Sequence, residues 1–162
     1  MVKGGDFITA CLKGVNFREA NLSNSVFPEN FGVVFSVAYS PDGKYFATGD
    51  ANCGVMLWRV ADYQTISTFR GHTGWVRSVV FSPDGNKLIS GSYDNTVKIW
   101  DIATGECLKT CKGHRSRIHE ITISPDGKTI ASGCTDQTVK LWNTETGECI
   151  KTLEEHIGSV RS

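Results

Sequence analysis

Serine, histidine and aspartate, the residue types of hydrolytic triads, occur together twice in this chain. The two sets have the same internal spacing and each ends at a tryptophan: His72, Ser90, Asp94 and Trp100, then His114, Ser132, Asp136 and Trp142. A nucleophilic serine of the hydrolase type would sit on a G-x-S-x-G elbow, which the sequence lacks. Since a catalytic triad has no reason to recur at a fixed interval beside a tryptophan, we predict a structural role for these residues and no catalytic residue.

The interval between the two sets is 42 residues, and it organises most of the chain. The tetrapeptide SPDG begins at Ser40, Ser82 and Ser124, and the three copies end at Trp58, Trp100 and Trp142. Within a copy, apolar and β-branched runs such as VRSVVFS and TVKIWD are separated by SPDG, YDNT and ATGE, which are typical of turns. Repetition at this length with four strand signals per copy predicts four-stranded antiparallel units.

With a histidine at the same place after each unit, His72, His114 and His156, the first two of them in a GH pair, and a tryptophan near the end of each copy, residues 33–156 resemble WD40 repeats. The resemblance implies an all-β fold of three propeller blades, at about 33–70, 75–112 and 117–154, in an open, incomplete propeller. It also implies that each His–Ser–Asp–Trp set is a hydrogen-bonded tetrad that ties the strands of one blade together. Because closed propellers have about four to eight blades, we expect residues 157–162 to be the start of a truncated fourth.

The first copy departs from this pattern. Asn30 stands in the place of the tetrad histidine, Asn52 in the place of the aspartate, and Arg59 follows Trp58 where the family has its WD aspartate. Thr48 and Trp58 fit the pattern. We therefore expect blade one to be either an atypical repeat, as is common at the end of an array, or a decayed one.

Residues 5–29 have a shorter period. Phe7, Leu12, Phe17, Leu22 and Phe27 recur every five residues. This period keeps neither one face of a helix nor one face of a strand. The segment resembles pentapeptide repeats, a family in which four pentapeptides form one coil of a square solenoid. We interpret residues 1–32 either as the last turn of a longer solenoid or as a partly disordered leader.

Charge and composition exclude several classes of partner. The 17 Lys and Arg residues are balanced by 17 Asp and Glu residues, so we predict neither nucleic-acid nor membrane binding. No apolar run is long enough to span a membrane, and the N-terminus lacks the apolar core of a signal peptide. The six cysteines form no C-x-x-C pair and no zinc-ligand spacing. We predict reduced thiols, no metal, no cofactor and a cytoplasmic location.

Partner binding is expected on one face of the blades. In the WD40 family this face lies at the start of each inner strand and at the turn before the third strand. The resemblance places there Trp75, Arg77 and Tyr93 of copy two, Arg117, His119 and Thr135 of copy three, and Val33, Phe35 and Ala51 of copy one.

Trp75 is informative without the family, because Val33 and Arg117 stand in its place in the other copies. Tryptophan, tyrosine and arginine dominate interface hot spots. We therefore predict a protein-binding or peptide-binding surface at Trp75, Arg77, Tyr93, Arg117 and His119. The alternative is that Trp75 covers the edge of a neighbouring blade.

Because every recognised motif is structural, the sequence predicts a non-catalytic protein–protein interaction scaffold that is a fragment of a larger bacterial regulatory protein. One alternative is the sensor portion of a signalling NTPase or kinase whose catalytic domain is absent here, and another is a truncated product without function. No P-loop or dinucleotide fingerprint is present in the sequence. We also expect self-association through the open blade edges, where Val55 and Leu57 at one end and Val139 and Leu141 at the other should be exposed.

Overall fold

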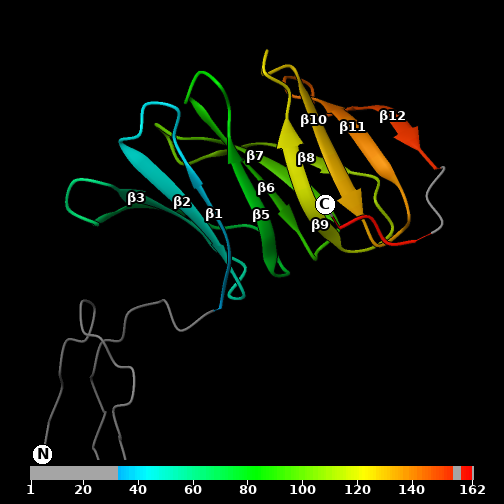
Figure 1. The fold of residues 1–162 in the computed structure, drawn as a ribbon, viewed down its shortest axis with the longest axis horizontal. Helices are drawn as coiled ribbons and strands as arrows, with labels where there is room; N and C mark the ends of the chain where they lie inside the picture. The colour runs from blue at the N-terminus through cyan, green and yellow to red at the C-terminus, as the bar shows by residue number, and fades with distance from the viewer. Residues whose placement is uncertain (1–32, 155–157, 162) are drawn as a thin grey trace, which may run out of the picture. The chain divides into compact units, whose positions relative to one another are not determined.

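The computed structural model describes residues 33–154 and 158–161, which form twelve β-strands and no helix. The strands make three four-stranded antiparallel sheets that follow one another along the chain (Figure 1). The predicted all-β fold of three blades in an open propeller is confirmed. The pentapeptide-like segment lies outside the described residues. Within the described part of the chain, no helix has the length and apolar character needed to cross a membrane.

Each blade is one sheet with its strands in chain order. Blade one consists of β1 (Val34–Tyr39), β2 (Tyr45–Asp50), β3 (Val55–Arg59) and β4 (Thr65–Phe69). Blade two consists of β5 (Val76–Phe81), β6 (Lys87–Ser92), β7 (Thr96–Asp101) and β8 (Cys107–Lys112). Blade three consists of β9 (Ile118–Ile123), β10 (Thr129–Cys134), β11 (Val139–Asn143) and β12 (Cys149–Leu153).

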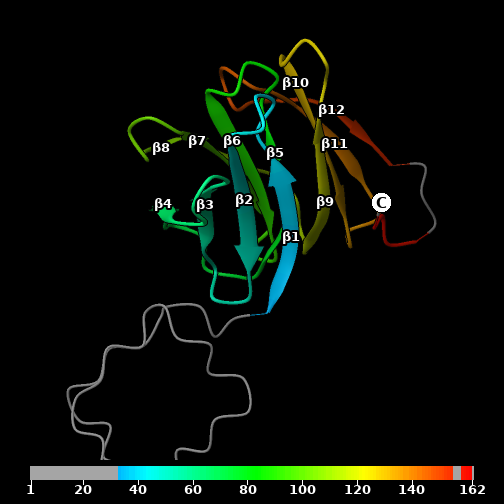
Figure 2. The same cartoon turned by 60° about the vertical axis from the view of Figure 1, so that its left-hand side comes forward.

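The first strands of the three blades, β1, β5 and β9, lie next to one another (Figures 1 and 2), and β4, β8 and β12 each form the opposite edge of their own sheet. The pairing register repeats with the sequence. The second and third strands pair so that Phe46 faces Trp58, Leu88 faces Trp100 and Ile130 faces Trp142. The outer strands are largely exposed, so the first three strands of each blade supply most of the core.

The SPDG tetrapeptides form the turns between the first and second strands. In the first of them, the Ser40 hydroxyl donates a hydrogen bond to Asp42 at 2.7 Å, and the Gly43 N–H donates to the Ser40 carbonyl at 2.9 Å. Gly43 has a φ of 69°, and its counterparts Gly85 and Gly127 have φ values of 73° and 72°. Glycine adopts this left-handed conformation at little cost, which explains its place in the repeat.

The hydrophobic core lies between neighbouring blades. One cluster joins blades one and two and buries Ala47, Val55, Leu57, Phe69, Val76, Val79, Phe81, Leu88 and Trp100. A second cluster joins blades two and three and buries Ile89, Val97, Ile99, Cys111, Ile118, Ile121, Ile130 and Trp142. Each sheet therefore buries the face that packs against a neighbouring blade. Blade two has a neighbour on both faces, which explains why its strands carry apolar residues on both sides.

A glycine in the second strand of each blade allows this close approach. A Cβ atom on Gly49 would lie 2.7 Å from Val76 Cγ1, and one on Gly91 would lie 2.7 Å from Ile121 Cγ2. On Gly133 it would lie 2.9 Å from Val160 Cγ1. Val160 therefore packs against Gly133 of blade three as Val76 packs against Gly49 of blade one.

The expected exposure of apolar residues at the first open edge is wrong in detail. Val55 and Leu57 are 0% and 1% exposed, because they face blade two. The residues exposed at this edge belong instead to β1, where Val37 is 62% and Tyr39 is 67% exposed. Their counterparts in blade two, Val79 and Phe81, are buried against blade one. At the other edge, Val139 and Leu141 are half-buried.

Candidate functional site

His72, Ser90, Asp94 and Trp100 come together inside blade two. His72 Nδ1 lies 2.7 Å from Asp94 Oδ2, and His72 Nε2 lies 2.7 Å from Ser90 Oγ. The indole N–H of Trp100 donates to Ser90 Oγ at 2.8 Å. His72 precedes β5, Ser90 lies on β6, Asp94 follows β6 and Trp100 lies on β7. The set therefore links the entry to the blade with its second and third strands.

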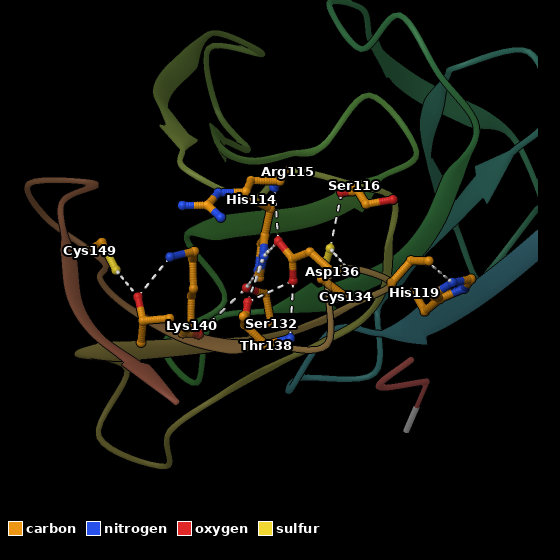
Figure 3. Close-up of polar contacts among 12 residues, drawn as sticks. His114, Arg115, Ser116, His119, Ser132, Cys134, Asp136, Thr138, Lys140 and Cys149 are labelled. Atoms are coloured by element: carbon orange, nitrogen blue, oxygen red, sulfur yellow. Dashed lines mark hydrogen bonds and ion pairs between the residues drawn. The ribbon is translucent and has the colours of Figure 1, made fainter. Parts of the chain in front are cut away.

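Blade three repeats the arrangement (Figure 3). His114 Nδ1 lies 2.9 Å from Asp136 Oδ2, and His114 Nε2 lies 2.7 Å from Ser132 Oγ. Trp142 Nε1 donates to Ser132 Oγ at 2.8 Å. A threonine two residues after each aspartate donates its hydroxyl to that carboxylate at 2.7 Å in both blades. The two tetrads therefore consist of the same four residue types and have the same additional hydrogen bond from a threonine.

The two carboxylates are ionised acceptors. Burial raises the pKa of Asp94, but hydrogen bonds from His72 and Thr96 outweigh this effect and hold the pKa far below its ordinary value of 3.8. Burial likewise raises the pKa of Asp136, and it is outweighed by hydrogen bonds from the Arg115 N–H and from Thr138. An ionised carboxylate satisfies several buried donors at once, which favours a structural role.

In blade three the protonation states also determine which group donates and which accepts in each hydrogen bond of the tetrad. Burial lowers the pKa of His114 below 6.5, and the opposing effect of Asp136 does not restore it, so the imidazole is neutral at pH 7. Because Asp136 can only accept, His114 Nδ1 carries the proton and Nε2 accepts from the Ser132 hydroxyl. Ser132 in turn accepts from Trp142.

This geometry does not present a serine nucleophile. Ser90 and Ser132 are 0% and 1% exposed, and the oxygen of each hydroxyl already accepts an indole N–H. A substrate carbonyl would need room beside that oxygen and donors for the developing oxyanion. The same bonds instead satisfy buried polar groups from three parts of the blade, which stabilises the fold.

Blade one has only part of this network. Trp58 Nε1 donates to Thr48 Oγ1 at 3.1 Å, as its counterparts donate to serine. At the turn after β2, the carboxylate comes from Asp50, whose Oδ1 accepts the N–H groups of Asn52 and Gly54 at 2.8 and 3.0 Å. Asn30 lies outside the described residues.

His114, Cys134 and Asp136 place ligand-type atoms within 4.8 Å of one another, the spacing of a metal site. Blade two explains this group. Ser92 stands in the place of Cys134, donates to the Gly74 carbonyl at 2.9 Å and accepts the Asp94 N–H. Cys134 does the same, donating to the Ser116 carbonyl and accepting the Asp136 N–H (Figure 3).

The state of the Cys134 thiol agrees with this role. Burial raises the pKa of Cys134 to about 11, so the thiol keeps its proton at pH 7 and can donate it to the Ser116 carbonyl. The group is therefore a turn in which cysteine replaces serine. The five cysteines that the structure describes are all free thiols.

A row of aromatic rings in contact with one another lies near the start of β1, β5 and β9, the first strands of the three blades. Phe35 and Trp75 stack with centroids 5.2 Å apart, although they belong to neighbouring blades, and Trp75 and Tyr93 stack at 5.6 Å. Tyr93 meets His119 of blade three edge-on at 5.3 Å. Trp75 is nevertheless 48% exposed, whereas Trp100 and Trp142 are 1% exposed. Trp75 thus both covers a blade boundary and faces the solvent.

Arginines complete this surface. The Arg77 guanidinium lies 4.6 Å from the centroid of Phe35 and 5.8 Å from that of Tyr93, and the Arg117 guanidinium lies 5.2 Å from Tyr93. We call the six residues the aromatic–arginine surface: Phe35, Trp75, Arg77, Tyr93, Arg117 and His119. Two adjoining cavities open on it, one of about 240 Å³ beside Trp75 and one of about 530 Å³ beside His119.

The structure thus brings together all five residues that the sequence suggested for partner binding. Thr135 also joins them, because its hydroxyl lies 2.7 Å from His119 Nε2, whereas Val33 contributes only an exposed apolar side chain. Sequence reasoning missed Arg161, which lines the larger cavity. Its signal was the repeat itself, because Arg161 follows His119 by the same 42 residues that separate His119 from Arg77.

Comparison with known proteins identifies the repeat. The family model for the WD domain, G-beta repeat, matches residues 23–59, 63–101 and 105–143, which is more than half of the chain. The second and third matches each begin in the turn before the outer strand of one blade, β4 or β8, and end with the third strand of the next. Each sequence repeat therefore bridges two blades.

Two curated relatives are similar over short stretches. One is an uncharacterised WD repeat-containing protein, alr3466, of Nostoc sp. strain PCC 7120, which is 50% identical over 54 residues, 33% of this chain and 4% of the relative. Another from the same organism, alr2800, is 47% identical over 69 residues, 40% of this chain and 6% of the relative.

The chain therefore spans a small part of the length of these relatives. WD40 repeats typically form protein-interaction scaffolds and are generally non-catalytic. The three repeat matches, together with three blades of four antiparallel strands, show that this chain belongs to the WD40 repeat family.

Proposed function

We propose that this chain is a non-catalytic protein-interaction scaffold whose binding surface is the aromatic–arginine surface. The observation that carries the proposal is the half-exposed indole of Trp75, held by stacking on Phe35 and Tyr93. A large aromatic residue that is both rigid and accessible loses little conformational freedom on binding, which is the property of interface anchors.

Contacts within the aromatic–arginine surface also hold its side chains in one conformation. Its residues come from all three blades, and the ring and cation–π contacts hold them in one arrangement before any partner arrives. The two cavities beside Trp75 and His119 share Tyr93 and Arg117, so one partner segment can fill both. This continuity favours an extended peptide or loop as the bound element.

Selection from a library of random peptides displayed on phage tests the proposal. We expect enriched peptides whose binding is lost on Trp75→Ala while the circular dichroism spectrum stays unchanged. Tyr63→Ala is the matched control, because Tyr63 is 73% exposed in the turn before β4 and lies outside the surface. Enriched peptides that bind Trp75→Ala as well as the wild type would contradict the proposal.

The finer role that we propose is a scaffold or sensor segment within a larger regulatory protein, acting in the cytoplasm of a bacterium. Its support is that the matched relatives, both from Nostoc, are much longer than this chain, which spans 4% and 6% of them. In such a protein the surface would recruit a partner while another segment carries any enzymatic activity. Sequencing the gene around this segment and assaying the whole product tests this placement.

Self-association is a second candidate, favoured by the two open edges. Between adjacent blades, Ser36 Oγ accepts the Val79 N–H at 3.1 Å, and Ser78 Oγ accepts the Ile121 N–H at 3.2 Å. Glu120 occupies the same place on β9, where its Oε1 accepts the Ser78 hydroxyl at 2.7 Å and its second carboxylate oxygen remains as a further acceptor. It borders an apolar groove of about 280 Å³ that also contains Ile121, Ala131, Gly133, Val139 and Val160.

We infer that β1 of a second copy binds this groove, with its Val37 N–H donating to Glu120. The exposed Val37 and Tyr39 side chains would then be covered as Val79 and Phe81 are. Since Val160 holds the start of the groove, residues 158–161 must move aside. Sedimentation velocity should show concentration-dependent dimers or chains that Val37→Glu abolishes and Ile150→Glu, at an exposed site on β12, does not. A wild type that stays monomeric at tens of micromolar would contradict this candidate.

A further inference from the structure

Three arginines line the larger cavity of the aromatic–arginine surface without any acidic residue beside them. Arg77, Arg117 and Arg161 share its wall with Tyr93, Ser116, His119 and Thr135. Within residues 33–154 and 158–161, no carboxylate forms an ion pair with any of the three guanidiniums. Three like charges around one cavity repel one another, so an anion that enters gains attraction from all of them.

Arg77 carries a second signal. Its Nε atom is buried and has no hydrogen-bond partner among the described residues. A buried donor left without a partner costs free energy in the folded protein. An acceptor oxygen placed in the cavity can remove that cost, provided that it reaches the guanidinium edge. The stacking of Arg77 on Phe35 meanwhile holds the guanidinium plane in place.

The other polar groups of the cavity suit an anion as well. Ser116 and Thr135 supply hydroxyls, which can donate. Burial, followed by the charges of Arg161, Arg77 and Arg117, lowers the pKa of His119, so this ring is neutral at pH 7 and adds no further positive charge. A bound anion would oppose these charges and favour protonation of His119, which then becomes an additional cationic donor.

We propose, resting on the interaction surface proposed above, that this cavity binds the phosphoryl group of a phosphorylated serine or threonine in a partner peptide. A phosphoryl group carries about −1.5 to −2 charges and three acceptor oxygens at pH 7, which matches three guanidiniums better than one carboxylate does. The planar guanidinium of an arginine can donate two parallel hydrogen bonds to two phosphoryl oxygens. Trp75 and the adjoining smaller cavity hold the flanking residue of the peptide.

The same residue types also occur where single-stranded nucleic acids bind, and there the aromatic rings offer free faces to the bases. Here Phe35, Trp75 and Tyr93 stack on one another, and arginines lie over Phe35 and Tyr93. Much of the ring surface is therefore already in contact with protein groups. The chain as a whole is neutral, which also favours a peptide over a polyanion.

Isothermal titration of the purified chain with three peptide pools tests the proposal. The pools share degenerate flanking positions and differ in one fixed central residue, which is phosphoserine, glutamate or serine. We expect the phosphoserine pool to bind at least about tenfold more tightly than the other two, since hydrogen bonds between arginine and a doubly charged phosphoryl group are stronger than those to a carboxylate or a neutral hydroxyl. Inorganic phosphate should compete, and binding should weaken as the salt concentration rises.

Variants locate the site. Arg117→Gln and Arg161→Gln, both at exposed positions, should each weaken binding of the phosphoserine pool about tenfold with an unchanged melting temperature. Lys151→Gln is the matched control, because it removes one charge from the exposed outer strand β12. Arg77→Lys keeps the charge but loses the fork, and should also weaken binding.

Equal affinity for the glutamate and phosphoserine pools would overturn the phosphoryl assignment. Tighter binding of a short oligothymidylate than of the phosphoserine pool would overturn it in favour of nucleic acid. If unmodified peptides from the phage selection bind in a manner that depends on Trp75 while phosphorylation changes nothing, this inference fails and the proposed scaffold function stands. If neither kind of peptide binds, both fail.

Discussion

The indole N–H of Trp100 donates to the hydroxyl oxygen of Ser90 at 2.8 Å, across adjacent strands of blade two. This bond orients the serine so that its own proton can point to His72, 2.7 Å away. The same relationship recurs between Trp142 and Ser132. A serine held in this way is a link between strands, and its removal should affect stability first.

Asp94→Ala and Asp136→Ala should each lower the free energy of unfolding by about 1–3 kcal/mol, because the buried donors of the tetrad lose their acceptor. Asn52→Ala, at the same position in blade one, should cost less. There Asp50 supplies the turn carboxylate, and its bonds come from backbone N–H groups that alanine retains. Urea unfolding followed by circular dichroism measures all three, and equal losses would contradict the structural role of the tetrads.

Stability should fall as the pH is lowered, in two stages. Burial lowers the pKa of His114 in the folded chain, so below about 6.5 the unfolded chain takes up a proton that the folded chain does not. The pKa values of Asp94 and Asp136 are also depressed in the folded chain, so a further loss begins near 3.8 and continues as the pH falls. Urea midpoints at pH 8, 5.5 and 3.5 test the order, and a midpoint that rises below pH 6 would contradict it.

Gly49→Ala should destabilise the chain by about 1–3 kcal/mol, because the new methyl group overpacks the boundary between blades one and two. Its Cβ would lie 2.7 Å from Val76 Cγ1 and 3.0 Å from the Val76 carbonyl oxygen. Gly158→Ala is the control, since no atom lies within 4 Å of a Cβ there. Thermal unfolding should separate the two variants. Equal melting temperatures would mean that the blades do not meet as closely as described.

Trp75→Ala and Trp100→Ala form a matched pair for separating binding from packing. Trp100 is 1% exposed and belongs to the core between blades one and two, so its loss should cost about 3–5 kcal/mol. Trp75 is 48% exposed, and its loss should leave the melting temperature within a few degrees of the wild type. An unfolded Trp75→Ala variant would assign Trp75 to packing alone.

Much of the fold could be predicted from the sequence, because its signals are local. The SPDG turns need glycine at a positive φ, and the strands between them carry apolar residues at a constant interval. The direction in which blades stack is not a local property. This is why Val55 and Leu57 were expected at the open edge, although they face blade two and Val37 and Tyr39 are exposed instead.

The proposed binding surface could likewise be predicted only in part from the sequence. The register of the repeat placed Trp75, Arg77, Tyr93, Arg117 and His119 on one face, and the structure brings them into contact. That Phe35 of blade one would stack on Trp75 depends on the rotation between blades, which the sequence does not encode in any short motif. Arg161 was missed because residues 157–162 were interpreted only as the start of a truncated fourth blade.

Nuclear magnetic resonance of the four tryptophan indole N–H groups shows whether a partner binds at Trp75, with a phage-selected peptide or the phosphoserine pool as the ligand. We expect the Trp75 signal to shift on saturation while those of Trp100 and Trp142, which are bonded to Ser90 and Ser132 inside their blades, stay in place. Saturable binding that leaves the Trp75 signal unchanged would show that the partner binds elsewhere and that the aromatic–arginine surface is not the binding site.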